Sequence, residues 1–360
     1  MAIINISDLT FNGEEVKAVS EAIQTQAYSN PELNKFHTIV TGINVKKQIA
    51  ILGRLSGLLG AAQGGCDPTS ASNTVTNSEK FWTPEKISDR LEACYDSLEG
   101  TFFAYGLKNG IEKADLTGTD FLNFVAQLVS ESLPEVIFRE GWFSDTSAAN
   151  YNSSPAGVIT NGTNLAYFNK NTGLWKQIYT IVAADATRKT AGLATKNAES
   201  TYALQAFNST DTTNQVVTDT LQNIMYGADE RLVSAPDLVL ISTRSVANQY
   251  ARELKKMNSA FTTERLENGI SLLKSDGVEL YSFGFWDRTI LSYFSNGTKS
   301  YLPHRIVMAS KSNIQIGTED EASLSKLDIF NDKKSKKNFI DFEFNLDAKI
   351  IESHMIQVAY

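Results

Sequence analysis

The longest helical pattern in the chain runs from Thr119 to Trp142. At its start, Thr119 can cap free backbone N–H groups and Asp120 complements the helix dipole. Apolar residues then recur at steps of three and four, which predicts an amphipathic helix with one buried face. These residues are Phe121, Phe124, Val125, Leu128, Val129, Leu133, Val136 and Ile137. Some two dozen helical residues span roughly 36 Å. We therefore expect one helix that crosses a whole domain, bends at Pro134 and ends near Gly141.

The clearest strand pattern lies near the end of the sequence. Apolar residues alternate there with polar ones, so one face of the strand is expected to be buried and the other wet. The apolar positions are Ile340, Phe342, Phe344, Leu346, Ala348 and Ile350. The alternation changes phase at Ile351, and a final strand is expected between His354 and Tyr360.

Helical and strand patterns are interleaved between residues 174 and 316, which indicates an α/β or α+β lobe. Helices are predicted over Leu174–Ala184, Val216–Val233 and Ser242–Met257. Strands are predicted over Leu238–Ile241, Val278–Phe283, Arg288–Phe294, Arg305–Ala309 and Asn313–Ile316, with a turn at Trp286 and Asp287.

The segment from Phe36 to Cys94 has a different residue pattern. Near its start, apolar and polar residues partly alternate, which indicates a strand, and a second candidate strand lies over Glu85–Cys94. Between them lies the polar tract Gln63–Ser78. A connection of this length with few core residues is normally functional or disordered, so we expect a long hairpin outside the domain. The preceding residues 1–35 contain one short helix, Glu14–Gln26, whose narrow apolar stripe must pack on another element or another chain.

Composition and charge narrow the classes of protein to which the chain can belong. With 360 residues and 42% hydrophobic content, the chain can bury a sizeable core in two or more lobes. A net charge of −8 argues against general nucleic-acid binding, although local basic patches remain possible. Cys66 and Cys94 have no metal-like spacing. The longest apolar stretch, Ile49–Ala62, is too short and too interrupted for a membrane span, and the first residues lack a secretory pattern, so we expect cytosolic synthesis and no membrane partner.

The chain shows no recognisable catalytic pattern. It contains no Gly-x-Ser-x-Gly, no phosphate loop with its lysine, no HExxH and no CxxC pair. His37, His304 and His354 are isolated from one another, so each is expected to be a core or surface residue. We therefore expect no catalytic, cofactor-binding or metal-binding residues, and a protein that is not an enzyme.

The order of these parts resembles the major capsid proteins of tailed bacteriophages, which have the Hong Kong ninety-seven fold. Several stretches look like capsid proteins of phages infecting Bacteroidetes. They are FHTIVTGINVKKQIAILG, the Cys66-Asp67-Pro68 turn, FWTPEKISDRLEACYDSLEGTF, ADLTGTDFLNF, GLWKQIYTIVAAD, PDLVLISTRSVANQYARELKKM and FEFNLDAKIIESHMIQVAY. Each motif is weak alone, and their order carries the resemblance.

The resemblance implies an α+β fold with four parts. These are an N-terminal arm (1–35), an extended β-hairpin loop (36–94), a peripheral domain (95–173 and 305–346) with the spine helix 119–142, and an axial domain (174–304 and 347–360). It also implies self-assembly through hexamers and pentamers into an icosahedral shell around double-stranded DNA, which is contacted on the inner face without sequence specificity. Portal, scaffold or decoration proteins are possible partners, and the expected location is the virion capsid, assembled in the cytoplasm of the host bacterium.

Two groups of charged residues are candidates for contacts between subunits. Lys46, Lys47 and Arg54 lie in the extended loop, and Glu135, Arg139 and Glu140 lie in the spine helix. The simpler interpretation of both groups is solvated surface charge. Two other functions also remain open, namely an encapsulin-like bacterial compartment of the same fold and a soluble α/β enzyme or binding module.

Overall fold

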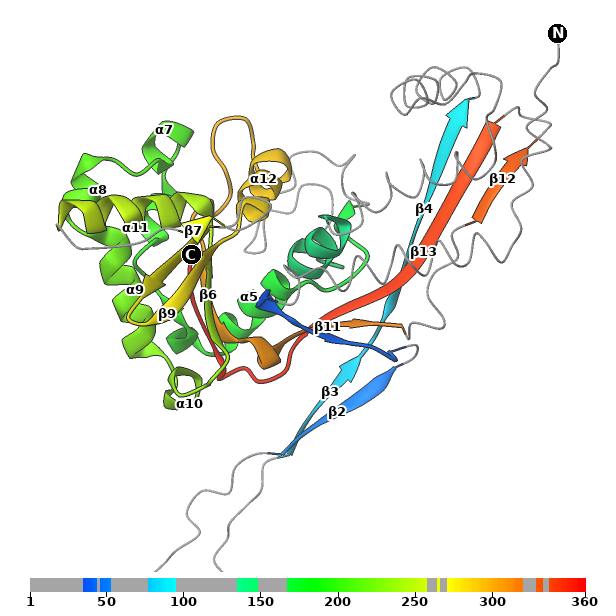
Figure 1. The fold of residues 1–360 in the computed structure, drawn as a ribbon, viewed down its shortest axis with the longest axis horizontal. Coiled ribbons are helices and arrows are strands. Elements are labelled where there is room, and N and C mark those ends of the chain that lie inside the picture. Colours follow the sequence, from blue (N-terminus) through cyan, green and yellow to red (C-terminus); the bar gives the residue numbers. More distant parts are fainter. Residues whose placement is uncertain are drawn as a thin grey trace, which may run out of the picture.

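The computed structural model describes residues 35–43, 46–52, 77–94, 135–147, 167–257, 264–265, 271–319, 328–332 and 337–360. These residues form a seven-stranded sheet, a five-stranded sheet and a separate two-stranded ladder (Figure 1). Residues 1–34 of the expected arm (1–35) lie outside the described residues. So does the part of the expected spine helix before residue 135.

The seven-stranded sheet has the order β5-β14-β10-β6-β9-β8-β7. Its strands are β5 (Lys189–Thr190), β14 (Ile356–Ala359), β10 (Ile306–Ser310), β6 (Leu238–Ser242), β9 (Val278–Ser282), β8 (Ser271–Ser275) and β7 (Glu264–Arg265). The central strand β10 is antiparallel to both β6 and β14, whereas β6 and β9 are parallel. Every residue of β10 is buried, because both faces of the sheet are covered.

Helices cover both faces of this sheet. On one face lie α9 (Val216–Gly227) and α11 (Arg244–Lys256), packed against Leu240 and Met308. On the other face lie α5 (Leu174–Ala184), α12 (Gly284–Tyr293) and a helix over residues 135–143, packed against Ile241 and Val307. Shorter helices connect these elements. They are α6 (Ala194–Ala198), α7 (Tyr202–Gln205), α8 (Ser209–Thr213), α10 (Glu230–Val233), and the 3-10 turns η3 (Ala186–Arg188) and η5 (Lys311–Asn313).

The five-stranded sheet is built on one long strand, β13. It contains β1 (Thr38–Val40), β11 (Ile314–Thr318), β13 (Lys337–Ile350), β12 (Asp328–Asp332) and β4 (Glu85–Cys94). Leu346 pairs with both Glu85 and Thr318, so β4 and β11 lie on opposite edges of β13. Phe344, Leu346, Ala348 and Ile350 are buried, as their alternation predicts.

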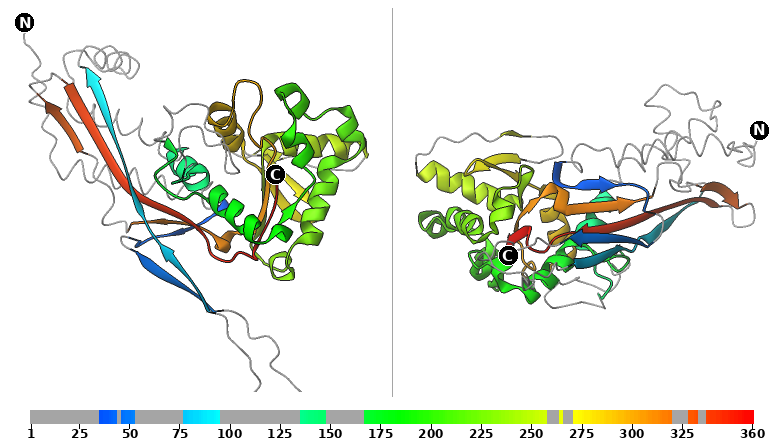
Figure 2. Two further views of the ribbon diagram at one scale, coloured as in Figure 1. Left: turned by 180° about the vertical axis from the view of Figure 1, so that it is seen from behind. Right: turned by 90° about the horizontal axis from the view of Figure 1, so that it is seen from below.

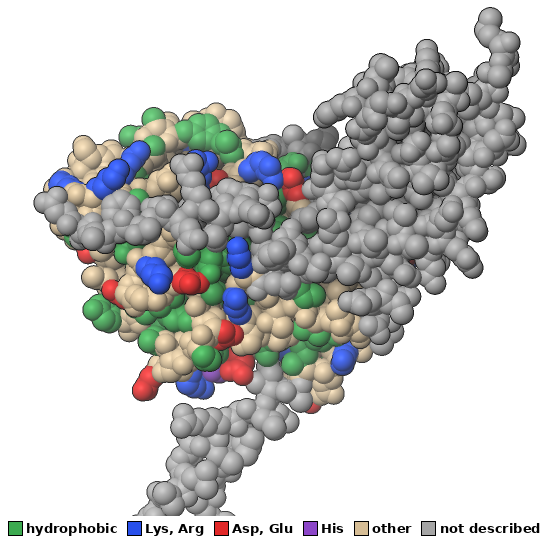
Figure 3. Space-filling view, viewed as in Figure 1, with side chains coloured by type: hydrophobic (Ala, Val, Ile, Leu, Met, Phe, Trp, Pro, Cys, Tyr) green, Lys and Arg blue, Asp and Glu red, His purple; other side chains and the backbone are tan. Residues whose placement is uncertain are grey.

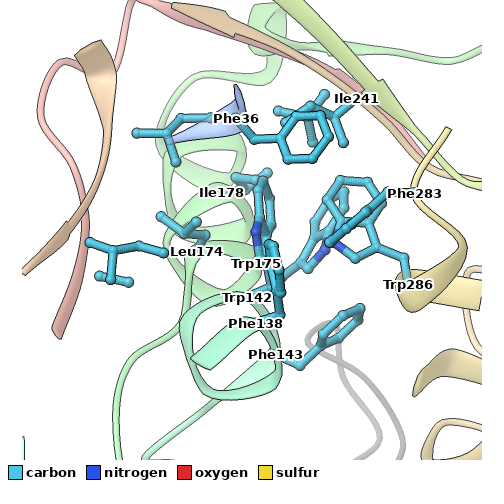
Figure 4. Close-up of a cluster of buried hydrophobic side chains, with 14 of the residues drawn as sticks. Phe36, Phe138, Trp142, Phe143, Leu174, Trp175, Ile178, Ile241, Phe283 and Trp286 are labelled. Atoms are coloured by element: carbon cyan, nitrogen blue, oxygen red, sulfur yellow. The ribbon is translucent and has the colours of Figure 1, made fainter. Parts of the chain in front are cut away.

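One aromatic core joins the two sheets. Trp142, Trp175 and Trp286 point toward one another in Figure 4, with ring centroids 4.6 Å apart for Trp142 and Trp286 and 5.2 Å apart for Trp175 and Trp286. Phe36 and Phe283 belong to the same cluster and are also buried. The helix over 135–143 therefore packs between the two sheets.

Most predicted elements are observed, and two predictions are wrong. Arg288–Phe294 is not a strand, because its residues up to Tyr293 belong to the helix α12 and Phe294 is the C-cap; Trp286 and Asp287 lie inside that helix. Its β-branched and aromatic residues favour a strand. The buried side chains, however, are Trp286, Thr289 and Ile290, and residues three and four apart share one face of a helix. The predicted helix Val216–Val233 is interrupted, since Asp229 caps a new helix, α10, by accepting a hydrogen bond from the Arg231 N–H at 3.0 Å.

The predicted boundaries of the four parts do not coincide with the points where the chain passes from one sheet to the other. Both ends of the range 36–94 lie in the five-stranded sheet, as β1 and β4, and Phe36 is buried in the core. The range 305–346 spans both sheets, because β10 pairs within the seven-stranded sheet whereas β11 pairs with β13. Short apolar runs such as β10 fit the centre of any sheet, so their pattern alone does not assign them to one.

Candidate functional site: the hairpin root

The two-stranded ladder projects from the body of the molecule. β2 (Lys47–Leu52) pairs with β3 (Asn77–Trp82), with Lys47 opposite Trp82, and in the described part of the chain neither strand joins the larger sheets. Figures 1 and 2 show the ladder running from the five-stranded sheet in the direction opposite to β12. We call residues 80–83, with the residues of β11 and β13 that they contact, the hairpin root.

An aromatic ring packed on a glycine forms the centre of the hairpin root. Trp82 is 3% exposed. A Cβ atom added to Gly317 of β11 would stand 2.7 Å from one carbon of the Trp82 ring and 2.8 Å from another. Only glycine leaves room for the ring at this position, so Gly317 and Trp82 together fix where β3 meets the sheet.

Two hydrogen bonds to β13 hold the same place. The Thr83 N–H donates to Oδ2 of Asp347 at 2.7 Å, and within β13 itself Nζ of Lys349 lies 3.3 Å from the same oxygen. Nζ of Lys80 donates to the Ile350 carbonyl at 2.7 Å. Burial raises the pKa of the Asp347 carboxyl, and burial, with the nearby Lys349 charge, lowers the pKa of Lys80. Desolvated contacts of this kind are costly to leave unmade, so they strengthen the attachment.

The chain is also attached to β11 just before it enters the ladder. The contact is to Thr318, the residue next to Gly317. The Ile43 N–H donates to the Thr318 carbonyl at 2.9 Å, and the Ile43 side chain is 1% exposed. Gly42 has a φ of +79°, which is readily adopted by glycine and lets the chain turn out of β1. Both ends of the segment that contains the ladder are therefore fixed to β11, at Gly317 and Thr318.

The ladder carries exposed side chains next to its root. Nζ of Lys46 lies 4.6 Å from the centroid of the Phe81 ring, which is 39% exposed. Lys47 and Gln48 are also exposed. Side chains alternate along a strand, so Lys47 shares a face with its ladder partner Trp82, and Phe81 shares the other face with Gln48. The exposed Phe81 ring with Lys46 beside it is a surface that a neighbouring molecule can cover, because Phe supplies apolar area and Lys supplies charge.

The structure separates the predicted contact residues. Arg54 lies outside the described residues. Glu135 is exposed and forms an ion pair with Arg288 of α12, with Oε2 and Nη2 2.9 Å apart. The guanidinium carbon of Arg139 lies 5.1 Å from the Tyr167 ring centroid. Contacts from Lys46, Lys47, Glu135 and Arg139 to another subunit stay predictions.

Glu140 lies inside its own chain. Its side chain is 2% exposed, and its carboxylate accepts a hydrogen bond from the Ser144 hydroxyl. Burial raises its pKa to about 7, against the opposing effects of that hydrogen bond and of the Arg139 and Lys170 charges. In this position Glu140 is a core residue, and a partner subunit would not reach it.

We expect Glu140→Gln to change how stability depends on pH. Because folding raises the pKa of Glu140 from 4.5 to about 7, the folded chain holds this proton more tightly than the unfolded chain within that window. The Glu140 contribution to the free energy of unfolding therefore falls by about 3 kcal/mol as the pH rises through the window. Glutamine still accepts from Ser144 but does not ionise, so the variant should gain about that much relative to the wild type between pH 5 and pH 8.

Urea unfolding of both proteins at the two pH values measures this difference. Other buried groups, such as Asp287 with its pKa raised by burial to about 6, titrate in both proteins, so comparison of the two isolates Glu140. A difference in unfolding free energy that stays constant with pH would contradict the assignment.

Sequence reasoning missed the residues that form the hairpin root. Trp82 lies just before the predicted strand Glu85–Cys94, and neither Gly317 nor Asp347 has a signal of its own. A glycine inside an otherwise apolar strand was the available indication, because such a glycine often marks close approach of another group.

Within the described residues, no three histidine, cysteine or carboxylate side chains come together to hold a metal ion. None of the helices found there is long and apolar enough to span a membrane.

Comparison with known proteins bears on the fold. No protein-family model and no curated protein sequence matches the chain. A chain of the satellite phage P4 procapsid that includes the size determination (Sid) protein is 12% identical, with a TM-score of 0.50, over 94% of this chain and 97% of that chain. A chain of Mycobacterium phage Ogopogo is 12% identical, with a TM-score of 0.48, over 91% and 90% of the two chains.

A chain of the holo-SrpI encapsulin complex from Synechococcus elongatus PCC 7942 is 7% identical, with a TM-score of 0.46, over 100% of this chain and 95% of that chain. Of these three matches, the procapsid chain alone reaches a TM-score of 0.5. At such low identity the likeness shows the fold and not the function. The chain therefore has a mixed α and β fold of the kind found in a phage procapsid.

Proposed function

We propose that the chain is a major capsid protein that assembles, through hexamers and pentamers, into the icosahedral shell around the double-stranded DNA genome of a tailed phage. The observation that carries the proposal is the ladder β2–β3, fixed at its root by Trp82 and Asp347 yet paired with no other strand in the described part of the chain. A two-stranded ladder is marginally stable alone and gains stability when a neighbouring molecule covers it. The shared fold with the P4 procapsid chain supports the same proposal.

The finer architecture is part of the proposal. The seven-stranded sheet with its helices corresponds to the axial domain of the Hong Kong ninety-seven fold, and the five-stranded sheet with the spine helix corresponds to the peripheral domain. The β2–β3 ladder belongs to the extended loop. The sequence resemblance to capsid proteins of phages infecting Bacteroidetes supports a phage of that group.

The proposed role is structural and not catalytic. The partners are further copies of the chain, with a portal, scaffold or decoration protein as possible additions, and the location is the virion capsid after assembly in the host cytoplasm. Each subunit then contributes many weak contacts that are lost together, which makes a closed shell stable.

Expression of the full chain, followed by size-exclusion chromatography and negative-stain electron microscopy, tests the proposal. Closed particles of uniform size are expected. A monomer or small oligomer that binds a small molecule would contradict it and favour an enzyme or binding module. Particles that enclose a specific protein cargo and never a genome would favour an encapsulin-like compartment.

Charge reversal at the exposed lysines of the ladder should impair assembly. In the double variant Lys46→Glu and Lys47→Glu, we expect few or no closed particles, because a neighbour covering this end of the ladder would meet two charges of the wrong sign. The free energy of unfolding of the unassembled chain should change by no more than about 1 kcal/mol, since both side chains are exposed.

The matched control reverses two exposed lysines elsewhere on the molecule, Lys170→Glu with Lys274→Glu, which changes the net charge by the same amount. Microscopy of both variants distinguishes a local contact from a general charge effect. Normal shells from the Lys46 and Lys47 variant would remove these lysines from the contact surface.

A further inference from the structure

The exposed face of α11 is basic along its length. Five of its side chains are exposed, namely Arg244, Asn248, Arg252, Lys255 and Lys256. At 100° per residue they fall within about one third of the helix circumference. The exposed face therefore has four cations, one amide and no carboxylate. Figure 3 shows Lys and Arg side chains along the margin of the molecule over α8 and α11.

The nearby carboxylates are committed elsewhere. Glu253, the sole acidic residue of α11, is 0% exposed and accepts from the N–H groups of Val217 at 3.2 Å and Thr218 at 2.8 Å. It therefore caps the start of α9. Asp287 accepts from the Arg244 N–H at 2.7 Å, which places a negative charge beside that arginine only.

The three remaining cations have no ion-pair partner within the described part of the chain. Arg252, Lys255 and Lys256 are absent from every ion pair found there, although Nζ of Lys256 donates to the Thr213 hydroxyl at 2.5 Å. The helix dipole favours cations in the last turn, which explains part of the placement of Lys255 and Lys256. It does not explain Arg252, one turn earlier, and it leaves all three charges available to a ligand in a chain whose net charge is −8.

The chemistry of this face fits a phosphate polymer better than a protein. The core of a protein interface is apolar and depleted of lysine, whereas the exposed arc of α11 contains no apolar side chain. Contacts to a nucleic-acid backbone need Lys and Arg and little else. Tyr250, the one aromatic residue of α11, is 6% exposed and turned into the core, so no ring is available for stacking on unpaired bases.

We propose that Arg252, Lys255 and Lys256 contact the phosphate backbone of double-stranded DNA without reading its sequence. This inference rests on the proposed function for the identity of the DNA as the packaged genome. In the closed shell, α11 then lines the inner surface.

The test compares binding of a random-sequence DNA duplex to the unassembled full chain and to its double variant Arg252→Gln with Lys255→Gln. Glutamine keeps the helix propensity of both positions, so the fold is retained. We expect affinity at low salt to fall roughly tenfold or more, and the slope of log K against log salt to lose about one unit per removed cation. Duplexes rich in A·T and in G·C should bind equally well.

The matched control is Lys274→Gln with Lys299→Gln, which removes two charges outside α11. Leu273 packs with the core on the α11 side of the sheet, so the neighbouring Lys274 of β8 points to the opposite face. Affinity and salt slope of this control should equal those of the wild type. An unchanged slope in the α11 variant, or an equal loss in the control, would overturn the inference.

Two further results separate this inference from its alternatives. If the α11 variant keeps DNA binding but loses binding to polyglutamate, the face docks an acidic protein and the inference is wrong. Microscopy of the same preparations reports the proposed function independently. Absence of shells from the wild-type chain would overturn that function, whereas normal shells with unaltered DNA binding by the variant would overturn only the role of α11.

Discussion

Replacing Gly317 by valine is expected to abolish shell assembly while leaving the two-sheet body folded. A Cβ at this position would stand 2.7 Å from the Trp82 ring, and valine adds two methyl groups beyond it. The ring has to leave its place on β11, and β3 then no longer meets the sheet at a fixed angle. Overpacking of this kind costs about 1–3 kcal/mol, which most folded domains survive. Assembly needs the same geometry in every subunit, so it should fail first.

Electron microscopy and urea unfolding of the Gly317→Val chain measure the two expectations separately. Gly141→Ala is the matched control, because its Cβ would lie 3.6 Å from Cδ1 of Ile316 on the same strand, at ordinary contact distance. This control should form normal shells. Normal shells from Gly317→Val would show that the packing of Trp82 on Gly317 does not direct the hairpin.

Replacing Trp142 by alanine is expected to cost about 3–5 kcal/mol of the free energy of unfolding. The side chain is 1% exposed and packs against Trp175 and Trp286 between the two sheets. Its Nε1–H also donates to Nε2 of His37 at 2.8 Å, which ties the start of β1 to the helix over 135–143. A loss of this size is a large share of the total stability of a typical protein.

Equilibrium unfolding in urea, followed by tryptophan fluorescence and circular dichroism, checks this prediction. Trp142→Phe keeps a ring in the cluster but loses the hydrogen bond to His37, so its loss should be smaller. Tyr226→Ala serves as a surface control, because Tyr226 is 83% exposed and its removal should change stability by no more than about 0.5 kcal/mol. Equal losses for the alanine variants at 142 and 226 would contradict the described core.

Elements with strong periodicity were predictable from the sequence. The alternation in β13 and the helical spacing in α5 each reflect one buried face, and the structure buries those faces. Helix α12 was not predictable from local preference. Its strand-forming residues become helical because Trp286 and Ile290, four residues apart, both enter the core that joins the sheets.

The hairpin root could not be read from the sequence, because it joins residues far apart along the chain. Nothing near Trp82 indicates that its ring packs on Gly317 or that the next residue binds Asp347. Charge alone was also a poor guide to exposure in the spine helix. Glu135 faces solvent and pairs with Arg288, whereas Glu140, just over one turn later, is buried where that helix enters the core. Only the packing of the helix end decides between these two outcomes.

The central claim is that the projecting ladder contacts a neighbouring copy of the chain. Particles assembled from an equal mixture of isotope-labelled and unlabelled chains, treated with an amine-reactive cross-linker and analysed by mass spectrometry, test it directly. We expect cross-links from Lys46 or Lys47 that join a labelled chain to an unlabelled one. Cross-links from these lysines that always join two peptides of the same isotopic composition would contradict it.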